Sequence, residues 1–134
     1  MKNYFSKKVF LHEFMDKAGM TLEQAQAACQ TMKQFEKLKE DNKVCLHMEP
    51  EQENYFSVCG EPNTVEEKNA IIHEIDTYGL WWITSKVRCK CCSKWDVADS
   101  VGMCIFNDPL DPVENPYIID LMNSAIVKYN EGVN

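Results

Sequence analysis

Long apolar runs are absent from the sequence, since no stretch approaches the roughly 20 apolar residues needed to cross a bilayer. Residues 1–8 lack the continuous apolar segment of a secretory signal, and no lipidation motif occurs at the C-terminus. A fully paired disulfide framework is not indicated, because the chain has seven cysteines, an odd number. These absences predict a cytoplasmic protein in a reducing compartment, without membrane association.

Positive charge is scarce. The sequence has 14 Lys and Arg against 21 Asp and Glu, which gives a formal net charge of −7 at pH 7. Because proteins bind the phosphate backbone largely through Lys and Arg, direct nucleic-acid binding is not expected. The acidity fits ordinary solubility, and it also fits an acidic surface that docks onto a basic protein.

Catalytic motifs are missing as well. The sequence has no glycine-rich phosphate loop and no paired-carboxylate motif, and its three histidines, His12, His47 and His73, occur in no recognisable catalytic context. We therefore interpret the chain as non-enzymatic. A thiol-dependent enzyme is the alternative, and it would require a cysteine and a histidine in contact.

The sequence does contain enough apolar residues for a core. Its 134 residues, 45% of them hydrophobic, predict a single domain over 1–134. Apolar residues at helical spacing predict one helix after a Ser6 cap and a second from Thr21 to about residue 39, separated by Gly19. Thr21 and Gln24 form a capping-box pattern. So short a connection predicts that the two helices form a hairpin.

Residues 8–48 resemble the first third of the bacterial histone-like DNA-bending proteins. The likeness consists of a helix, the link Ala18-Gly19-Met20-Thr21, a second helix, and Asn42-Lys43-Val44 entering a strand. It implies a helical hairpin at this end of the chain. Those proteins use a long basic arm on DNA, which this sequence lacks, and the acidity here is opposite in sense. The resemblance therefore carries over no function.

The middle of the chain predicts two strands and a helix. Alternating residues over 44–48, stopped by Pro50, predict one strand, and a second strand is predicted over Tyr55–Cys59. A capping pattern at Thr64 predicts a third helix that ends at Gly79 and buries an apolar stripe. The stripe consists of Val65, Ile71, Ile72, Ile75 and Tyr78.

Residues 80–106 predict a strand, a cysteine turn and a returning strand. The first strand should turn one face to the core, namely Trp81, Ile83, Ser85, Val87 and Cys89. After an acidic, proline-rich loop, a last helix is predicted from about residue 116 to 129. Its buried stripe should be Ile118, Leu121, Met122, Ala125 and Ile126. The prediction is an α+β fold, with an N-terminal helical hairpin, a small antiparallel sheet interrupted by one helix, and a C-terminal helix.

The sharpest chemical signal is the Cys89-x-x-Cys92 turn, because such turns direct two sulfur atoms toward one metal ion. We predict a structural zinc site in a zinc-ribbon-like hairpin, with Cys59 and Cys104 as the other two ligands. The substitutes for that second pair are Cys45, His47 and Cys91. Free thiols around a small sheet would give the same pattern, and the vicinal pair Cys91-Cys92 also fits a redox or soft-metal role.

Two surfaces are candidates for partner binding. On the outer face of the first ribbon strand, Trp82, Lys86 and Arg88 combine an aromatic side chain with cations, as interfaces often do. In the loop over 107–116, prolines hold an acidic patch in place, and this patch would attract a basic groove. Its residues are Asp108, Asp111 and Glu114. The first surface could equally bind single-stranded nucleic acid, or it could be an ordinary solvent-exposed sheet face without a binding role.

We therefore expect a small acidic cytoplasmic protein that binds another protein without catalysis and is stabilised by zinc. Its size and acidity fit inhibitors or adaptors of nucleic-acid-handling machinery, which present a basic nucleic-acid-binding groove. Inhibitors of host defence nucleases made by phages and other mobile elements belong to this class, although no motif indicates them. A nucleic-acid-binding module and a thiol-dependent enzyme are the alternatives.

Overall fold

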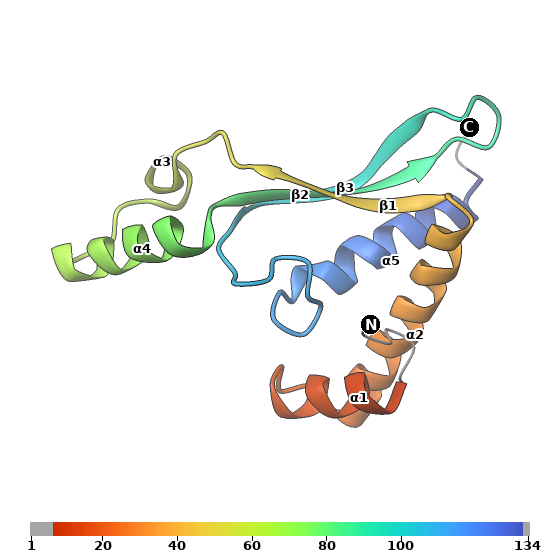
Figure 1. Cartoon of the computed structure of the whole chain (residues 1–134), viewed down its shortest axis with the longest axis horizontal. Coiled ribbons are helices and arrows are strands. Elements are labelled where there is room, and N and C mark those ends of the chain that lie inside the picture. The colour runs from red at the N-terminus through yellow and green to blue at the C-terminus, as the bar shows by residue number, and fades with distance from the viewer. Residues whose placement is uncertain (1–6, 133–134) are drawn as a thin grey trace.

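The computed structural model of the chain describes residues 7–132, so the expected Ser6 cap lies outside the described residues. Within them the chain forms five helices and a three-stranded antiparallel sheet, the α+β class that the sequence predicts (Figure 1). None of the described helices has the length and apolarity that a bilayer crossing requires. The elements are α1 (Lys7–Asp16), α2 (Leu22–Glu40), β1 (Val44–Pro50), α3 (Tyr55–Cys59), α4 (Val65–Tyr78), β2 (Trp81–Arg88), β3 (Trp95–Cys104) and α5 (Tyr117–Asn130).

The helices α1 and α2 form the predicted hairpin. Thr21 Oγ1 accepts a hydrogen bond from the Gln24 amide at 3.2 Å, and Gln24 Oε1 accepts one from the Thr21 amide at 3.0 Å. This capping box fixes the start of α2, and Gly19, with φ +68°, supplies the left-handed turn before it. Phe10 and Phe14 of α1 are buried in the core.

The sheet has β2 at its centre, with β1 and β3 antiparallel on either side. At one end of β2, Trp81 lies between Pro50 of β1 and Cys104 of β3. At the other end Arg88 faces Trp95. The helices α1, α2 and α5 all lie on one side of this sheet (Figure 1). The core therefore forms on that side, and the other face carries no helix within the described residues.

The predicted inner face of α5 is confirmed, and that of β2 is confirmed except at Trp81, which is only partly buried, while Thr84 of the opposite face is buried as well. On β2 and in the turn after it, Ile83, Ser85, Val87 and Cys89 are buried. The buried residues of α5 are those of the predicted stripe, namely Ile118, Leu121, Met122, Ala125 and Ile126. α5 packs against all three strands and against α2, which explains why its apolar stripe is fully covered.

The prediction of a strand over Tyr55–Cys59 is wrong, because these residues form the short helix α3. Asn54 Oδ1 accepts hydrogen bonds from the amides of Phe56 and Ser57, at 2.9 and 3.2 Å. Gly60, with φ +89°, ends the helix. A local cap at each end outweighs the strand preference of the aromatic and β-branched residues between them.

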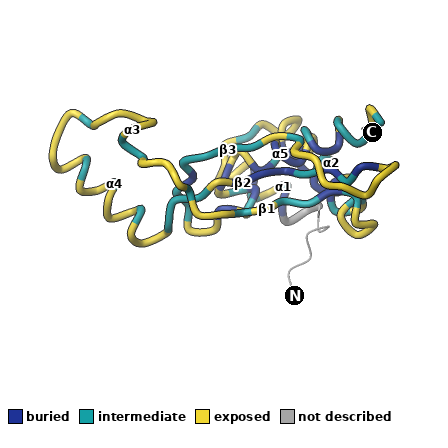
Figure 2. Tube along the Cα trace, turned by 90° about the horizontal axis from the view of Figure 1, so that it is seen from above, coloured by how far each residue is buried: buried dark blue, intermediate teal, exposed yellow. Residues whose placement is uncertain are grey.

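The helix α4 begins and ends as predicted, but its apolar stripe is not buried. Thr64 Oγ1 accepts a hydrogen bond from the Glu67 amide at 3.1 Å, and Gly79 follows the last turn. None of the residues of α4 is buried, and Val65 is 71% exposed. Both α3 and α4 lie beyond one end of the sheet, away from the other helices (Figures 1 and 2). The stripe therefore has no core to pack against.

Candidate functional site

The turn that joins β2 to β3 is the strongest candidate site. The Cys89 amide donates to the Lys94 carbonyl at 2.7 Å, and the Ser93 amide donates to the Cys89 carbonyl at 3.1 Å. Ser93 has φ +61°, a left-handed conformation that allows so short a turn to close. The chain thus reverses within residues 89–94, and the cysteines of the turn are brought close together.

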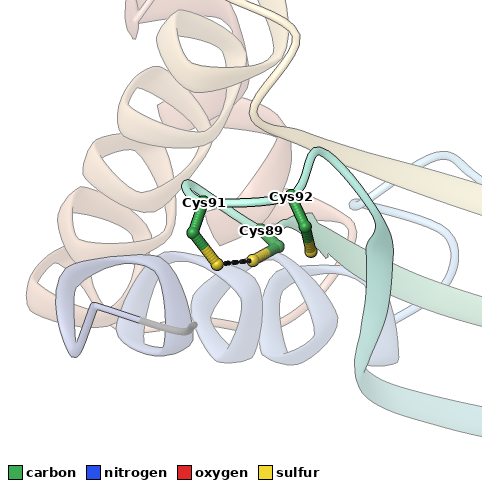
Figure 3. Close-up of side chains that lie close together, drawn as sticks. All are labelled: Cys89, Cys91 and Cys92. Atoms are coloured by element: carbon green, nitrogen blue, oxygen red, sulfur yellow. Dashed lines mark hydrogen bonds between the residues drawn. The ribbon is translucent and has the colours of Figure 1, made fainter.

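Three sulfur atoms converge in this turn. The Sγ atoms of Cys89, Cys91 and Cys92, called here the thiol cluster, all lie within 4.8 Å of one another. The Cys89 and Cys91 sulfurs are 3.0 Å apart and share a hydrogen bond (Figure 3). Cys89 is buried, whereas Cys91 and Cys92 are exposed. The cluster therefore has one sheltered sulfur and two that are open to solvent.

Hydrogen bonding within the thiol cluster separates the pKa values of its members. The hydrogen bond from Cys91, followed by one from Cys92, lowers the pKa of Cys89 from 9.0 to about 7. The same hydrogen bond to Cys89, helped by desolvation, raises the pKa of Cys91 to about 11. The Cys89 sulfur is thus the first of the two to lose its proton, and the resulting thiolate is stabilised by the proton that Cys91 retains.

The three thiols are close enough to bind a metal ion. Thiolates are ligands for zinc and for softer ions such as Cu(I). Among residues 7–132, no histidine or carboxylate joins the cluster. Two of the nearby cations lie over aromatic rings: Lys90 Nζ is 4.3 Å from the Tyr129 ring centroid, and the Arg88 guanidinium is 5.9 Å from that of Trp95. The protein side of the site therefore offers three sulfur ligands.

The structure brings together two members of the predicted four-cysteine set, Cys89 and Cys92. Cys104 ends β3 at the far end of the sheet, and its burial raises its pKa. Cys59 ends α3, beyond that same far end, and is exposed. Cys91, a substitute ligand in the sequence analysis, supplies the third sulfur instead. The sequence signal for Cys91 was the Cys-x-Cys-Cys spacing within one tight turn. The position of Cys104 relative to this turn depends instead on the pairing register of β2 and β3, which the sequence does not show.

The remaining substitute ligands lie apart from the thiol cluster. Cys45 is on β1, and partial burial raises its pKa in spite of two nearby lysines. The His47 ring nitrogen Nε2 lies 3.1 Å from Glu49 Oε1. His12 likewise pairs with Asp16 at 2.7 Å, one turn along α1. Both histidines thus interact with carboxylates rather than with sulfur.

The side of the sheet that faces away from the helices, called here the open sheet face, carries Trp82, Lys86 and Arg88 as their alternation indicates. Trp82 is 40% exposed, and its indole N–H donates to Thr84 Oγ1 at 2.9 Å. A Cβ atom at Gly102 would lie 3.0 Å from the Trp82 ring, so the indole packs directly on the Gly102 backbone. The ring is therefore fixed in place although it is exposed.

The acidic loop before α5 presents less free charge than its sequence indicates. The Glu114 carboxylate accepts hydrogen bonds from the amides of Asn107 and Asp108, at 2.8 and 3.1 Å. Asp111 Oδ1 accepts one from the Val113 amide at 2.9 Å. Two of the three predicted partner-binding carboxylates thus help to hold the loop in shape. The Asp108 side chain is the most available of the three.

Residues 8–48 form the helical hairpin and the following strand that the sequence predicts, namely α1, α2 and β1. Comparison with known proteins finds no match to this chain among family models, curated proteins or solved structures.

Proposed function

We propose that the protein is a non-enzymatic protein-binding protein that acts through the open sheet face. The observation that carries the proposal is the one-sided sheet, whose helices cover one face while the other exposes Trp82, Trp95 and Val97. Tryptophan and arginine are the residues that most often contribute the binding energy of protein interfaces. An uncovered sheet that carries both is a natural binding surface.

The aromatic residues on this face are held in position before any partner arrives. Trp82 is fixed by its hydrogen bond to Thr84 and by its contact with Gly102. The Arg88 guanidinium lies over the Trp95 ring. Side chains that are already ordered lose less conformational entropy on binding, which favours affinity.

For the partner, we propose a component of nucleic-acid-handling machinery with a basic groove. A host defence nuclease inhibited by a mobile-element protein is the specific form. The net charge of −7 supports this choice, because opposite charges accelerate the encounter with a basic partner. We place the protein in a reducing cytoplasm, which suits its unpaired thiols. These thiols are Cys45, Cys59, Cys89, Cys91, Cys92 and Cys104.

Affinity capture from a native lysate tests the open sheet face. Trp82→Ala should lose the captured partner, whereas Tyr117→Ala, which removes an exposed aromatic side chain of α5 on the helical side, should keep it. The melting temperature of Tyr117→Ala should stay within about 4 °C of the parent, since surface substitutions cost little. Trp82→Ala should melt somewhat lower, because it also loses the hydrogen bond to Thr84 and the contact with Gly102, but should remain folded. A partner retained by Trp82→Ala, or a large loss of stability in that variant, would contradict the proposal.

Single-stranded nucleic acid is a second candidate ligand for the same face. Two tryptophans beside Lys86 and Arg88 match the combination of stacking platforms and cations that such sites use. A labelled oligonucleotide should then bind in a salt-sensitive way, and the double variant Lys86→Ala, Arg88→Ala should lose that binding. Absence of binding by the parent at low salt would dismiss this candidate.

We further propose that the thiol cluster holds zinc in a structural role. Zinc takes thiolates readily, and a structural ion contributes directly to the folding free energy. Protein purified under reducing conditions without chelator should carry about one zinc per chain. Cys92→Ser should lose the metal, whereas Cys45→Ser, which removes a thiol outside the cluster, should retain it. Metal analysis without stoichiometric zinc in the parent would refute the assignment.

A further inference from the structure

The net charge of the chain is concentrated in one segment. Residues 49–79, called here the acidic arm, run from the end of β1 through α3 and α4 to the start of β2. They contain eight Asp and Glu and a single cation, Lys68, so their formal charge is −7. The other 103 residues contain thirteen acidic and thirteen basic side chains. The acidic arm thus accounts for the whole net charge.

The acidic arm has no core of its own. All its residues are described, none is buried, and both its helices lie clear of α1, α2 and α5 (Figures 1 and 2). Four of its apolar side chains are strongly exposed: Val58 (59%), Val65 (71%), Ile72 (39%) and Tyr78 (42%). Several exposed apolar side chains on one projecting segment indicate a surface that a partner can cover.

A few hydrogen bonds around Glu51 and Leu80, called here the neck, connect the acidic arm to the sheet. The Glu51 amide donates to the Leu80 carbonyl at 2.8 Å, and the Glu51 carboxylate accepts a hydrogen bond from the Met103 amide at 3.0 Å. The Trp81 indole N–H donates to the Tyr78 carbonyl at 2.9 Å. These bonds continue the strand pairing beyond Pro50, so the arm extends the sheet along its length instead of folding back onto the core.

Little within the acidic arm balances its charge. Lys68 Nζ lies 2.9 Å from Glu61 Oε2 and 5.0 Å from the Phe56 ring centroid. The sequence gives the arm no second cation. Asp76 lies in the last turn of α4, where the helix dipole disfavours a carboxylate, and that turn contains no basic residue. The arm therefore has both an electrostatic and an apolar reason to bind a cationic surface.

We propose that the acidic arm inserts into a basic groove of the partner protein, a groove shaped to hold the phosphates of a nucleic acid. The proposal rests on the protein-binding function proposed above, and it names the element that enters the partner and the chemistry that receives it. The arm carboxylates meet Lys and Arg of the groove in place of phosphates. The same insertion covers the exposed apolar side chains of the arm.

A second copy of this chain fits the arm less well. Its basic end offers four cations on the turn between β2 and β3 and on the strand before it, namely Lys86, Arg88, Lys90 and Lys94. Four cations cannot neutralise a charge of −7. An arm-to-turn contact would also be head-to-tail, and such a contact gives open chains unless its rotation closes a ring.

The test compares two variants with the same change in total charge. The arm variant carries Glu66→Gln, Glu67→Gln, Glu74→Gln and Asp76→Asn, all on α4. The body variant carries Glu23→Gln, Glu40→Gln, Asp120→Asn and Glu131→Gln, which are equally exposed. A labelled oligo-arginine peptide serves as the probe of groove chemistry, and fluorescence anisotropy measures its affinity for the full chain. Circular dichroism checks that α4 remains helical.

We expect the arm variant to bind the peptide about tenfold more weakly than the parent at low salt, and the body variant to stay within about twofold. Equal losses in both variants, or no loss in either, would overturn the proposal. Loss of the captured partner by Trp82→Ala is read without the peptide, so failure of the open sheet face and failure of the arm are distinguishable. Self-association of the parent by sedimentation, abolished in the arm variant, would identify a second copy as the occupant and also overturn it.

Discussion

The body of the protein, meaning all residues outside the acidic arm, and the arm both contain amphipathic helices. The apolar stripes of these helices are buried in the body and exposed in the arm. In the body, α2 and α5 turn their apolar stripes to the core and bury residues such as Phe35 and Ile126. In the arm, α4 has a comparable stripe, but Val65 and Ile72 face solvent. The body is electrically balanced, whereas the arm carries −7. An amphipathic sequence therefore predicts an apolar stripe on a helix. Whether the rest of the fold or a partner buries that stripe depends on where the helix lies in the structure.

Truncating one stripe residue in each region should give the largest contrast. Phe35→Ala should lower the free energy of unfolding by about 3–5 kcal/mol, because Phe35 is 1% exposed and its removal leaves a cavity. Ile72→Ala should cost about 0.5 kcal/mol or less, as surface substitutions usually do. Urea unfolding of both variants measures the difference. A loss near 2 kcal/mol for Ile72→Ala would mean that the arm has a core after all.

The thiol cluster should give the body a pH-dependent metal affinity that the arm does not share. Cys91, with a pKa of about 11, must release its proton to bind zinc at any pH below that value. The Cys91 proton alone should make the apparent affinity fall about tenfold per unit as pH decreases from 8 to 7. Any proton held by Cys92 must also leave on binding, so tenfold is the smallest expected slope. Below about 7 the fall should steepen, because Cys89 then also holds a proton.

Competition with a chelator at several pH values measures this slope. The four-residue arm variant is the control, since its substitutions lie beyond the far end of β2 and should leave the slope unchanged. A zinc affinity that does not change between pH 6 and 8 would contradict the prediction that thiols of the cluster release protons when zinc binds.

The neck between the two regions should make a moderate contribution to stability. The Glu51 carboxylate accepts hydrogen bonds from the amides of Met103, Gln52 and Glu53, at 3.0, 3.1 and 3.4 Å. Glu51→Gln removes the charge from these bonds and should cost about 1–2 kcal/mol in the free energy of unfolding. Glu53→Gln, at an exposed neighbour, should be close to neutral. Equal effects of the two substitutions would show that the neck does not depend on this carboxylate.

Replacing the arm should have the smallest effect on stability. The bond between the Glu51 amide and the Leu80 carbonyl leaves two antiparallel chain ends side by side, so Asn-Gly can replace residues 52–79 as a tight hairpin turn. The unfolding free energy should change by no more than about 1 kcal/mol, because every buried residue lies outside the deleted segment. Oligo-arginine binding should be lost. Loss of cooperative unfolding in this variant would show that the body depends on the arm for its stability, which contradicts the comparison.

The parts of the fold that sequence predicted best depend on local interactions. The Thr21 cap, the stripe of α5 and the turn that follows β2 are each specified by residues close together in the chain. The pair Cys89 and Cys92 belongs to the same class. Such features are readable from sequence because the interacting residues lie within a turn or two of one another.

The features that sequence missed depend on local competition or on distant contacts. Asn54 makes α3 a helix although its residues favour strands, which is a contest between a cap and intrinsic preference. The exposure of the α4 stripe depends on where β1 and β2 end, and Cys104 is separated from Cys89 by the strand register. No short-range pattern encodes these distances.

The placement of charge along β2 makes the molecule a strong electric dipole. The acidic arm lies beyond the start of this eight-residue strand, and the cations of Lys86, Arg88, Lys90 and Lys94 lie at its other end, separated by about 25 Å of extended chain. In the field of a positively charged partner, a dipole experiences a torque before any contact is made. The protein would thus rotate during its approach and arrive arm first, so that a larger share of random collisions is productive. High salt would shorten the range of this alignment and slow association, while leaving the lifetime of the formed complex much less affected.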